Sequence, residues 1–266
     1  RGEIEAANGT NRTLPVVLNT ASQFKARAYN PGSSEWSALT STFFGINLVP
    51  AAADNLVISE IHYHPAEPTS AAEIAVSTDR DDYEFIELLN VGTRPLELEG
   101  VHLSDGVSFA FGSERLLDPG ARAVLVQDVE AFTARYGEGV AIAGEYSGKL
   151  NNGGERLSLD LVGVGVLHEL DYGDNSPWPA AADDNGVSLV LRNAESVPDH
   201  SLPESWGNHT TVGGGPGVAD TIAESGLANW KVANGVTSND EDADLDGLTA
   251  LVEYALGTSP NPVSYT

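Results

Sequence analysis

NLVISEIHYH (Asn55–His64) and YEFIELLNV (Tyr83–Val91) are the two stretches that decide the fold. Both are rich in β-branched, leucine and aromatic side chains, and their lengths suit a strand better than a core helix. Six further segments share this character: VHLSDG, VSFAFG, RAVLVQD, RLSLDLV, VGVLHELDY and VSLVLRN. Turn sequences such as DPG (Asp118–Gly120) separate them. Many short strands with little helix apart from Val129–Gly137 predict a mostly β fold, an antiparallel β-sandwich spanning residues 55–217.

The same region resembles the lamin tail domain, an immunoglobulin-like β-sandwich. The segments that carry the resemblance are VISEIHYHP, DDYEFIELLNVGTRPLELEGVHLSDG, LDPGARAVLVQD, LNNGGERLSLDL, ELDYGDNSPWPAAADDNGVSLVLRN and PESWGNHTTVGGGPG. They follow one another from Leu56 to Gly217 in the order usual for that family. The resemblance implies a binding or spacer module of the kind found in many secreted bacterial proteins. It implies no catalytic residues.

Residues 1–47 precede this region and are predicted to form a partial β accessory module. Strands are expected at Leu14–Asn19, Gln23–Asn30 and Thr40–Ile46. In the second of these, Phe24, Ala26 and Ala28 alternate with polar residues, which predicts a half-buried strand. The segment TLPVVLNTASQFKARAYNPGSSEWSALTSTF resembles the C-terminal module of chitobiase-type secreted proteins, which implies a small β-sandwich without catalytic residues.

The C-terminal segment, residues 222–266, contains the loop DADLDGLTALVE (Asp242–Glu253). Its acidic residues and Gly247 fit the calcium-loop pattern D-x-[DN]-x-[DN]-G-x5-E. Ca²⁺ takes about six to eight oxygen ligands. The side chains of Asp242, Asp244 and Asp246, the backbone carbonyl of Leu248 and a bidentate Glu253 would provide them. The alternative is an acidic turn without an ion, followed by a helix cap.

Helices are predicted on both sides of this loop, at Glu224–Gly235 and Leu248–Thr258, which is a helix-loop-helix arrangement. The stretch NDEDADLDGLTALVEYALGTSP resembles dockerin-like and thrombospondin-type-3-like calcium segments. Dockerins pair two such loops, whereas this segment has one. A calcium-stiffened joint to a further domain is therefore favoured over cohesin docking.

Composition restricts the possible partners and surroundings. The 266 residues have a formal net charge of −26, and such a surface repels phosphates and anionic lipids, so nucleic acid is not an expected partner. There is no run of about 18 apolar residues, so no membrane insertion is expected. The chain contains neither Cys nor Met and begins at Arg1, so we expect a processed piece of a longer protein. An extracellular or cell-surface location is expected.

Motifs of nucleophilic, zinc-protease, phosphate-loop and dinucleotide sites are missing from the sequence, so no enzyme is expected. Glu84 and Glu87 are an odd number of residues apart, which points them to opposite faces of a strand, and both are expected at the solvent-exposed rim. His62 and His64 share one face and with Glu60 could hold zinc or copper. The alternative is a pair of partly exposed strand histidines, and a third imidazole cannot be assigned.

Four tryptophans and one glycine-rich segment complete the candidates. Exposed aromatic rings stack on sugars, whereas buried ones supply apolar area to a core. Trp178 and Trp206 lie near strand ends and are expected to close the core, while Trp36 and Trp230 lie in the flanking segments. The segment GGGPG (Gly213–Gly217) is interpreted as a linker.

The sequence thus favours a non-enzymatic, calcium-binding extracellular module for structure, adhesion or assembly within a larger secreted bacterial protein. Its expected partners are other domains of that protein or copies of itself. The alternative is an accessory carbohydrate-binding region of a secreted hydrolase, with glycans as ligands.

Overall fold

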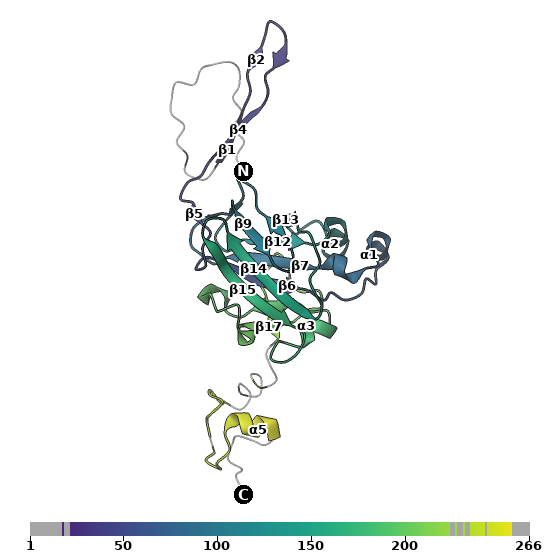
Figure 1. Cartoon of the computed structure of the whole chain (residues 1–266), viewed down its shortest axis with the longest axis vertical. Helices are drawn as coiled ribbons and strands as arrows, with labels where there is room; N and C mark the ends of the chain where they lie inside the picture. The colour runs from purple at the N-terminus through teal and green to yellow at the C-terminus, as the bar shows by residue number, and fades with distance from the viewer. Residues whose placement is uncertain are drawn as a thin grey trace.

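A seven-stranded sheet in the order β13-β12-β7-β6-β16-β17-β18 forms the centre of the molecule (Figure 1). The structure is a computed structural model that describes residues 18, 22–223, 227, 231, 235–242 and 244–256. The strands of this sheet are β6 (Leu56–His62), β7 (Phe85–Asn90), β12 (Arg122–Val126), β13 (Ile142–Glu145), β16 (Leu189–Leu191), β17 (Trp206–His209) and β18 (Ile222–Ala223). Its pairs are antiparallel except β12 with β13, which is parallel.

A four-stranded antiparallel sheet in the order β10-β9-β14-β15 packs on one face of the central sheet (Figure 1). Its strands are β9 (Val101–Ser104), β10 (Phe109–Ala110), β14 (Gly154–Leu161) and β15 (Gly165–Gly173). Alternate residues of each sheet point into the space between them, since successive side chains of a strand face opposite sides. Ile58, Ile86 and Leu88 from the central sheet meet Leu157 and Leu159 there. This is the core of a β-sandwich.

A three-stranded sheet, β11-β8-β5, lies at the edge of this core. Its strands are β5 (Val49–Pro50), β8 (Leu96–Glu97) and β11 (Leu116–Leu117), and β5 pairs with β8 in parallel. The paired strands of the sandwich therefore run from Val49 to Ala223. The mostly β, immunoglobulin-like fold class predicted from the sequence is confirmed, and each of the eight predicted strands contains an observed one. The strands β5, β8, β11, β13, β17 and β18 were not predicted, because segments of two to four residues are too short to show a clear period.

Helix α2 (Val129–Tyr136) covers the other face of the central sheet, as Figure 1 shows at the side of β12 and β7. Asp128 caps this helix, since its Oδ1 accepts the amide of Ala131 at 2.8 Å. Phe132 packs on Phe85, with ring centroids 5.9 Å apart. Strands β6 and β7 are consequently buried on both faces along their whole length.

Several short helices were not predicted. They are α1 (Ala71–Val76), α3 (Ala181–Asp184) and the 3₁₀ helices η1 (Arg80–Tyr83), η2 (Ala194–Ser196) and η3 (Pro203–Ser205). Helix α1 begins with a complete capping box, in which Ser70 accepts the amide of Glu73 and the Glu73 carboxylate accepts the amide of Ser70. The S-x-x-E spacing was the available sequence signal for this helix.

The N-terminal segment forms two hairpins, β1 (Ser22–Ala26) with β4 (Thr40–Phe44) and β2 (Tyr29–Asn30) with β3 (Glu35–Trp36). The predicted half-buried strand is wrong in one respect, because Ala26 and Ala28 are exposed. No second layer covers the described part of these hairpins. The predicted strand at 14–19 lies, apart from Leu18, outside the described residues.

Near the C-terminus, the second predicted helix is present as α5 (Ala250–Leu256). The helix predicted for 224–235 falls outside the described residues except at Leu227, Lys231 and Gly235. Within the described ranges, no helix combines the length and the apolar character that crossing a membrane requires.

Candidate functional site

The predicted calcium loop brings three of its acidic side chains together. One carboxylate oxygen from each of Asp242, Asp244 and Asp246 lies within 4.8 Å of the other two. Amides of the loop fix this arrangement, since the Asp246 nitrogen lies 3.2 Å from Oδ1 of both Asp242 and Asp244. Gly247 adopts φ +93°, in the left-handed region that glycine enters without steric cost. The local geometry therefore has the turn and the clustered oxygens of the sequence pattern.

Glu253 lies on the first turn of α5 and is completely buried. Burial raises the pKa of its carboxyl, and Asp244, Asp246 and Asp242 raise it further by repulsion. Glu253 is thus near the three aspartates, but it is not part of the group whose oxygens lie within 4.8 Å of one another. Leu248 is the remaining predicted ligand residue. Its amide donates to Oδ1 of Asp246 at 2.8 Å, and this bond holds Leu248 at the loop.

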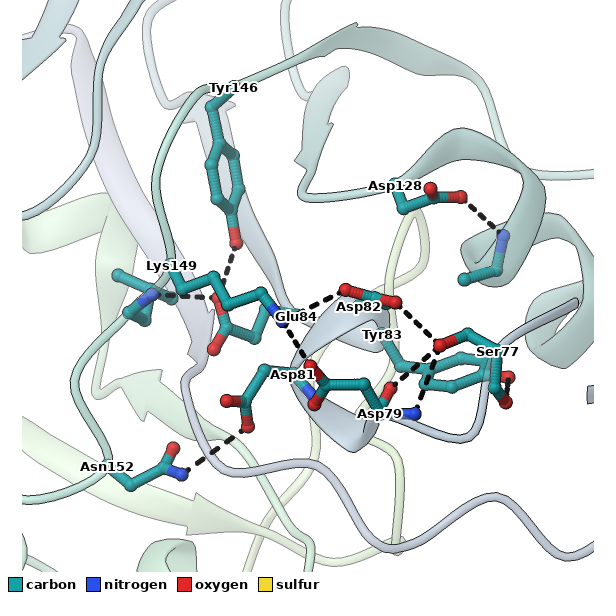
Figure 2. Close-up of polar contacts among 12 residues, drawn as sticks. Ser77, Asp79, Asp81, Asp82, Tyr83, Glu84, Asp128, Tyr146, Lys149 and Asn152 are labelled. Atoms are coloured by element: carbon teal, nitrogen blue, oxygen red, sulfur yellow. Dashed lines mark hydrogen bonds and ion pairs between the residues drawn. The ribbon is translucent and has the colours of Figure 1, made fainter. Parts of the chain in front are cut away.

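Glu84 belongs to a buried polar network beside β7 (Figure 2). Its Oε2 accepts the Tyr146 hydroxyl at 3.1 Å and the Leu150 amide at 2.8 Å. Burial raises the pKa of Glu84 to about 9, and Asp81 adds to the rise. Its Oε1 has no hydrogen-bond partner among the described residues. Glu84 is therefore a neutral carboxylic acid at pH 7.

Charged residues at the rim of this network hold the neighbouring turn (Figure 2). Lys149 places Nζ 2.5 Å from Oδ2 of Asp79 and 3.0 Å from Oδ1 of Asp82. Ser77 donates its hydroxyl to Asp82 at 2.6 Å, and the Tyr83 hydroxyl donates to the Ser77 carbonyl at 3.0 Å. These contacts tie η1 to the loop before β14, so their role is structural.

Glu87 has a separate set of partners. Its Oε1 accepts the Ser59 hydroxyl at 2.7 Å and forms an ion pair with Nε of Arg122 at 2.8 Å. Burial raises the pKa of Glu87 to about 7. The predicted separation of Glu84 and Glu87 is confirmed, because they share no hydrogen-bond partner. Their predicted exposure is wrong, because both are completely buried: Glu84 is hydrogen-bonded to Tyr146 and Leu150 of the sandwich core, and Glu87 lies beneath segments that cover the outer face of the sheet.

One of those covering segments is Gly213–Gly217, so its interpretation as a linker was wrong. The Gly215 amide donates to Oε1 of Glu60 at 2.9 Å, and the Gly217 amide donates to Oε2 of Glu87 at 2.6 Å. Gly214 has φ +74°, and a Cβ there would overlap the Glu60 and Ser188 side chains. Glycine is required because the backbone passes directly over buried carboxylates. Acidic residues inside apolar strand sequences were the overlooked signal for this arrangement.

His62, the last residue of β6, and His64, two residues beyond it, do not form a three-ligand group with Glu60 among the described residues. His62 is completely buried, and burial lowers its pKa to about 3, so it is neutral. His64 places Nδ1 2.6 Å from Oδ1 of Asp183. The predicted partial exposure of both histidines was wrong, since His64 is also buried.

The tryptophans divide as the sequence predicted. Trp206 is 1% exposed and donates its indole N–H to the His200 carbonyl at 2.9 Å. Trp178 is half-buried against the same core. Trp36 is 54% exposed on β3, and Trp230 lies outside the described residues.

These observations define the class of protein: an immunoglobulin-like β-sandwich that serves as a structural or binding module. The family model named Lamin Tail Domain matches residues 49–197, which is more than half of the chain, and the chain belongs to that family. The match starts at β5 and ends before β17, so the glycine segment lies beyond it.

The crystal structure of a DUF4876 family protein from Bacteroides thetaiotaomicron VPI-5482 is similar with a TM-score of 0.36 and 10% sequence identity, over 77% of this chain and 84% of that chain. None of the curated proteins matches the sequence.

Proposed function

We propose that this chain is a non-enzymatic, calcium-binding structural module of a larger secreted bacterial protein. It would act outside the cell, in adhesion or assembly, with other domains of that protein or copies of itself as partners. In this proposal the sandwich is a rigid spacer, and Ca²⁺ stiffens the segment that follows it.

The observation that carries the calcium proposal is the convergence of Asp242, Asp244 and Asp246, with the buried Glu253 near them. Four carboxylates at one loop repel one another, and no Lys or Arg follows Lys231 in the sequence. A divalent cation with a preference for oxygen ligands would remove this repulsion. It would also hold α5 against the loop, because Glu253 is the ligand that belongs to the helix.

Support for a structural role comes from the way the buried acids are used. Glu84 and Glu87 bind backbone amides and side chains of the same fold, and Glu60 binds the amide of Gly215. A general acid or base needs contact with a substrate. These three carboxylates are instead covered, so they support the fold. The resemblance of the flanking segments to modules of secreted proteins supports the proposed location.

Calcium titration of the full chain tests the proposal. Metal-stripped protein should show a melting temperature that rises with Ca²⁺, because a ligand of the folded state stabilises it by about 2.7 kcal/mol at one hundred times Kd. The double variant Asp244→Ala, Glu253→Ala should abolish the rise, whereas Asp240→Ala, just outside the loop, should retain it. An unchanged melting temperature of the wild type in millimolar Ca²⁺ would remove the calcium proposal.

A second candidate function is glycan binding, and exposed aromatic rings on the N-terminal hairpins favour it. Tyr29 and Trp36 are 48% and 54% exposed, with ring centroids 4.7 Å apart, and the Arg27 guanidinium lies 4.3 Å from the Trp36 ring. Such rings stack on sugars. Retention on insoluble polysaccharides that is lost in Trp36→Ala and kept in Leu39→Ala would favour this function. Concentration-dependent self-association without retention would favour the structural role.

A further inference from the structure

A second group of donor atoms lies on the outer face of the central sheet, remote in sequence from the calcium loop. It consists of Glu60 on β6, His209 at the end of β17 and Asp220 just before β18. Each offers one donor atom, and these three atoms lie within 4.8 Å of one another. Glu60 is completely buried, His209 is 5% exposed, and the side chain of Asp220 is 11% exposed.

Two oxygens of this group lack partners although they are buried. Oε1 of Glu60 accepts from the Gly215 amide and the Ser188 hydroxyl, and Oδ2 of Asp220 pairs with Nη2 of Arg122 at 3.1 Å. The remaining oxygens, Oε2 of Glu60 and Oδ1 of Asp220, have no hydrogen-bond partner among the described residues. A buried carboxylate oxygen without a partner is costly, so native structures satisfy such atoms with a ligand, an ion or a proton.

The charges around the group point to a cation. The guanidinium of Arg122 pairs with Glu87 and with Asp220, and the Glu60 carboxylate lies beside Asp220, so three carboxylates share one positive charge among these four residues. When all are ionised, two negative charges are in excess in a space that is almost closed to water. Buried charges persist when they are paired or coordinate a metal, and one divalent cation would balance this excess.

We propose that Glu60, His209 and Asp220 bind a divalent first-row transition metal ion, with Zn²⁺ as the ion that the donor set fits best. One imidazole nitrogen and two carboxylate oxygens are ligands that Zn²⁺ accepts, with a water molecule in the remaining position. Ca²⁺ prefers oxygen ligands alone, so this site and the C-terminal loop select different ions.

Both ring nitrogens of His209 have neighbours in the fold. Nδ1 lies 3.0 Å from the Thr211 amide, which donates to it, and 3.3 Å from the Thr211 carbonyl oxygen, while Nε2 lies 3.4 Å from the Thr221 hydroxyl. Binding a metal through Nε2 selects the tautomer with the proton on Nδ1, where the Thr211 carbonyl oxygen accepts it, because a ligating imidazole is held by a hydrogen bond from its other nitrogen. The loop glycine Gly215 passes close to Nε2, and a Cβ there would lie 2.8 Å from it. The ion enters past Asp220, the most exposed of the three ligands.

Binding experiments on the full chain test this site. Metal-stripped protein saturated with Ca²⁺ is titrated with Zn²⁺, and the bound zinc is measured after equilibrium dialysis. His209→Gln and Asp220→Asn should each weaken Zn²⁺ binding at least about tenfold. The matched control His102→Gln changes a half-buried histidine whose Nδ1 contacts the Gly100 carbonyl, and it should bind Zn²⁺ as the wild type does.

A measurement on the wild type keeps the test decisive if a variant does not fold. Co²⁺ in place of Zn²⁺ should give visible d–d absorption and one paramagnetically shifted imidazole N–H signal in the proton NMR spectrum. Failure to bind Zn²⁺ or Co²⁺ would overturn the proposal, as would equal binding by His209→Gln. A wild-type melting temperature that does not respond to Zn²⁺, together with a pH dependence that Asp220→Asn reduces, would show that the two carboxyls share a proton instead. Zn²⁺ binding that survives Asp244→Ala separates this site from the calcium loop.

Discussion

Replacing Glu84 with Gln tests whether a buried neutral acid makes stability depend on pH. The pKa of Glu84 is about 9 in the fold, against 4.5 as its ordinary value. Between these pH values the unfolded chain releases the proton and the folded chain keeps it. The free energy of unfolding therefore falls as pH rises, by about 1.4 kcal/mol per pH unit for this one group. From pH 5.5 to 7.5 the loss is at most about 2.7 kcal/mol.

The Gln side chain preserves the packing and the acceptor for Tyr146 and Leu150 and removes the titration. Chemical unfolding of both proteins is measured at several pH values and constant Ca²⁺. The difference between their free energies of unfolding at each pH isolates the contribution of Glu84. Glu87 and other groups titrate equally in both proteins and cancel. Wild type should lose stability with rising pH relative to Glu84→Gln, and the variant should be the more stable protein at pH 7.5.

The exposed residue Glu138 provides the matched control, since Glu138→Gln should leave the wild-type pH profile unchanged. Parallel profiles for Glu84→Gln and wild type would refute the reasoning, because Glu84 would then ionise as easily in the fold as in the unfolded chain. A profile of opposite sign would mean that the Lys149 charge outweighs burial.

Three further variants test the packing by chemical denaturation. Gly214→Ala should destabilise the protein by at least about 2 kcal/mol more than Gly163→Ala. Both glycines have positive φ, but only at Gly214 would an added Cβ overlap neighbouring side chains. Equal losses of stability would show that this overlap is unimportant. Trp206→Ala should cost about 3–5 kcal/mol, whereas Trp36→Ala should change stability by less than about 0.5 kcal/mol; a small effect at Trp206 would contradict its place in the core. Ser70→Ala should cost about 1 kcal/mol through the lost capping bonds of α1, and no change would indicate that water replaces the hydroxyl.

Much of the fold was predictable because strands such as β6 and β7 carry their signal locally. Runs of branched and aromatic residues between turn sequences predict a strand, and this signal does not depend on which other strand it pairs with. The clustering of Asp242, Asp244 and Asp246 was predictable for the same reason, since they are neighbours in sequence, whereas calcium binding stays a prediction. The amides of Asp246 and Gly247 donate back to the carboxylates of Asp242 and Asp244 and so bring these side chains together.

Sequence patterns failed where a residue's surroundings come from another part of the chain. Glu84 and Glu87 were expected at the rim because carboxylates favour water, yet distant segments cover them. The group of Glu60, His209 and Asp220 joins a residue of β6 to two residues near the C-terminal end of the sandwich sequence, so no local spacing could indicate it. On the N-terminal hairpins the error was the opposite one, because residues expected to be half-buried are exposed. Alternation predicts an apolar face but does not show whether another layer covers it.

In the proposed role as a connection between domains, the loop Gly213–Gly217 has a mechanical consequence. A pull on the chain beyond Ala223 first loads β18, whose two residues pair with β17 at the edge of the sheet. The load then reaches Asp220, which pairs with Arg122, and after it the amides of Gly217 and Gly215, which donate to carboxylates inside the sheet. Tension applied from the C-terminal side is thus expected to separate β18 from β17 first, and the loop Gly213–Gly217 is expected to resist further extension.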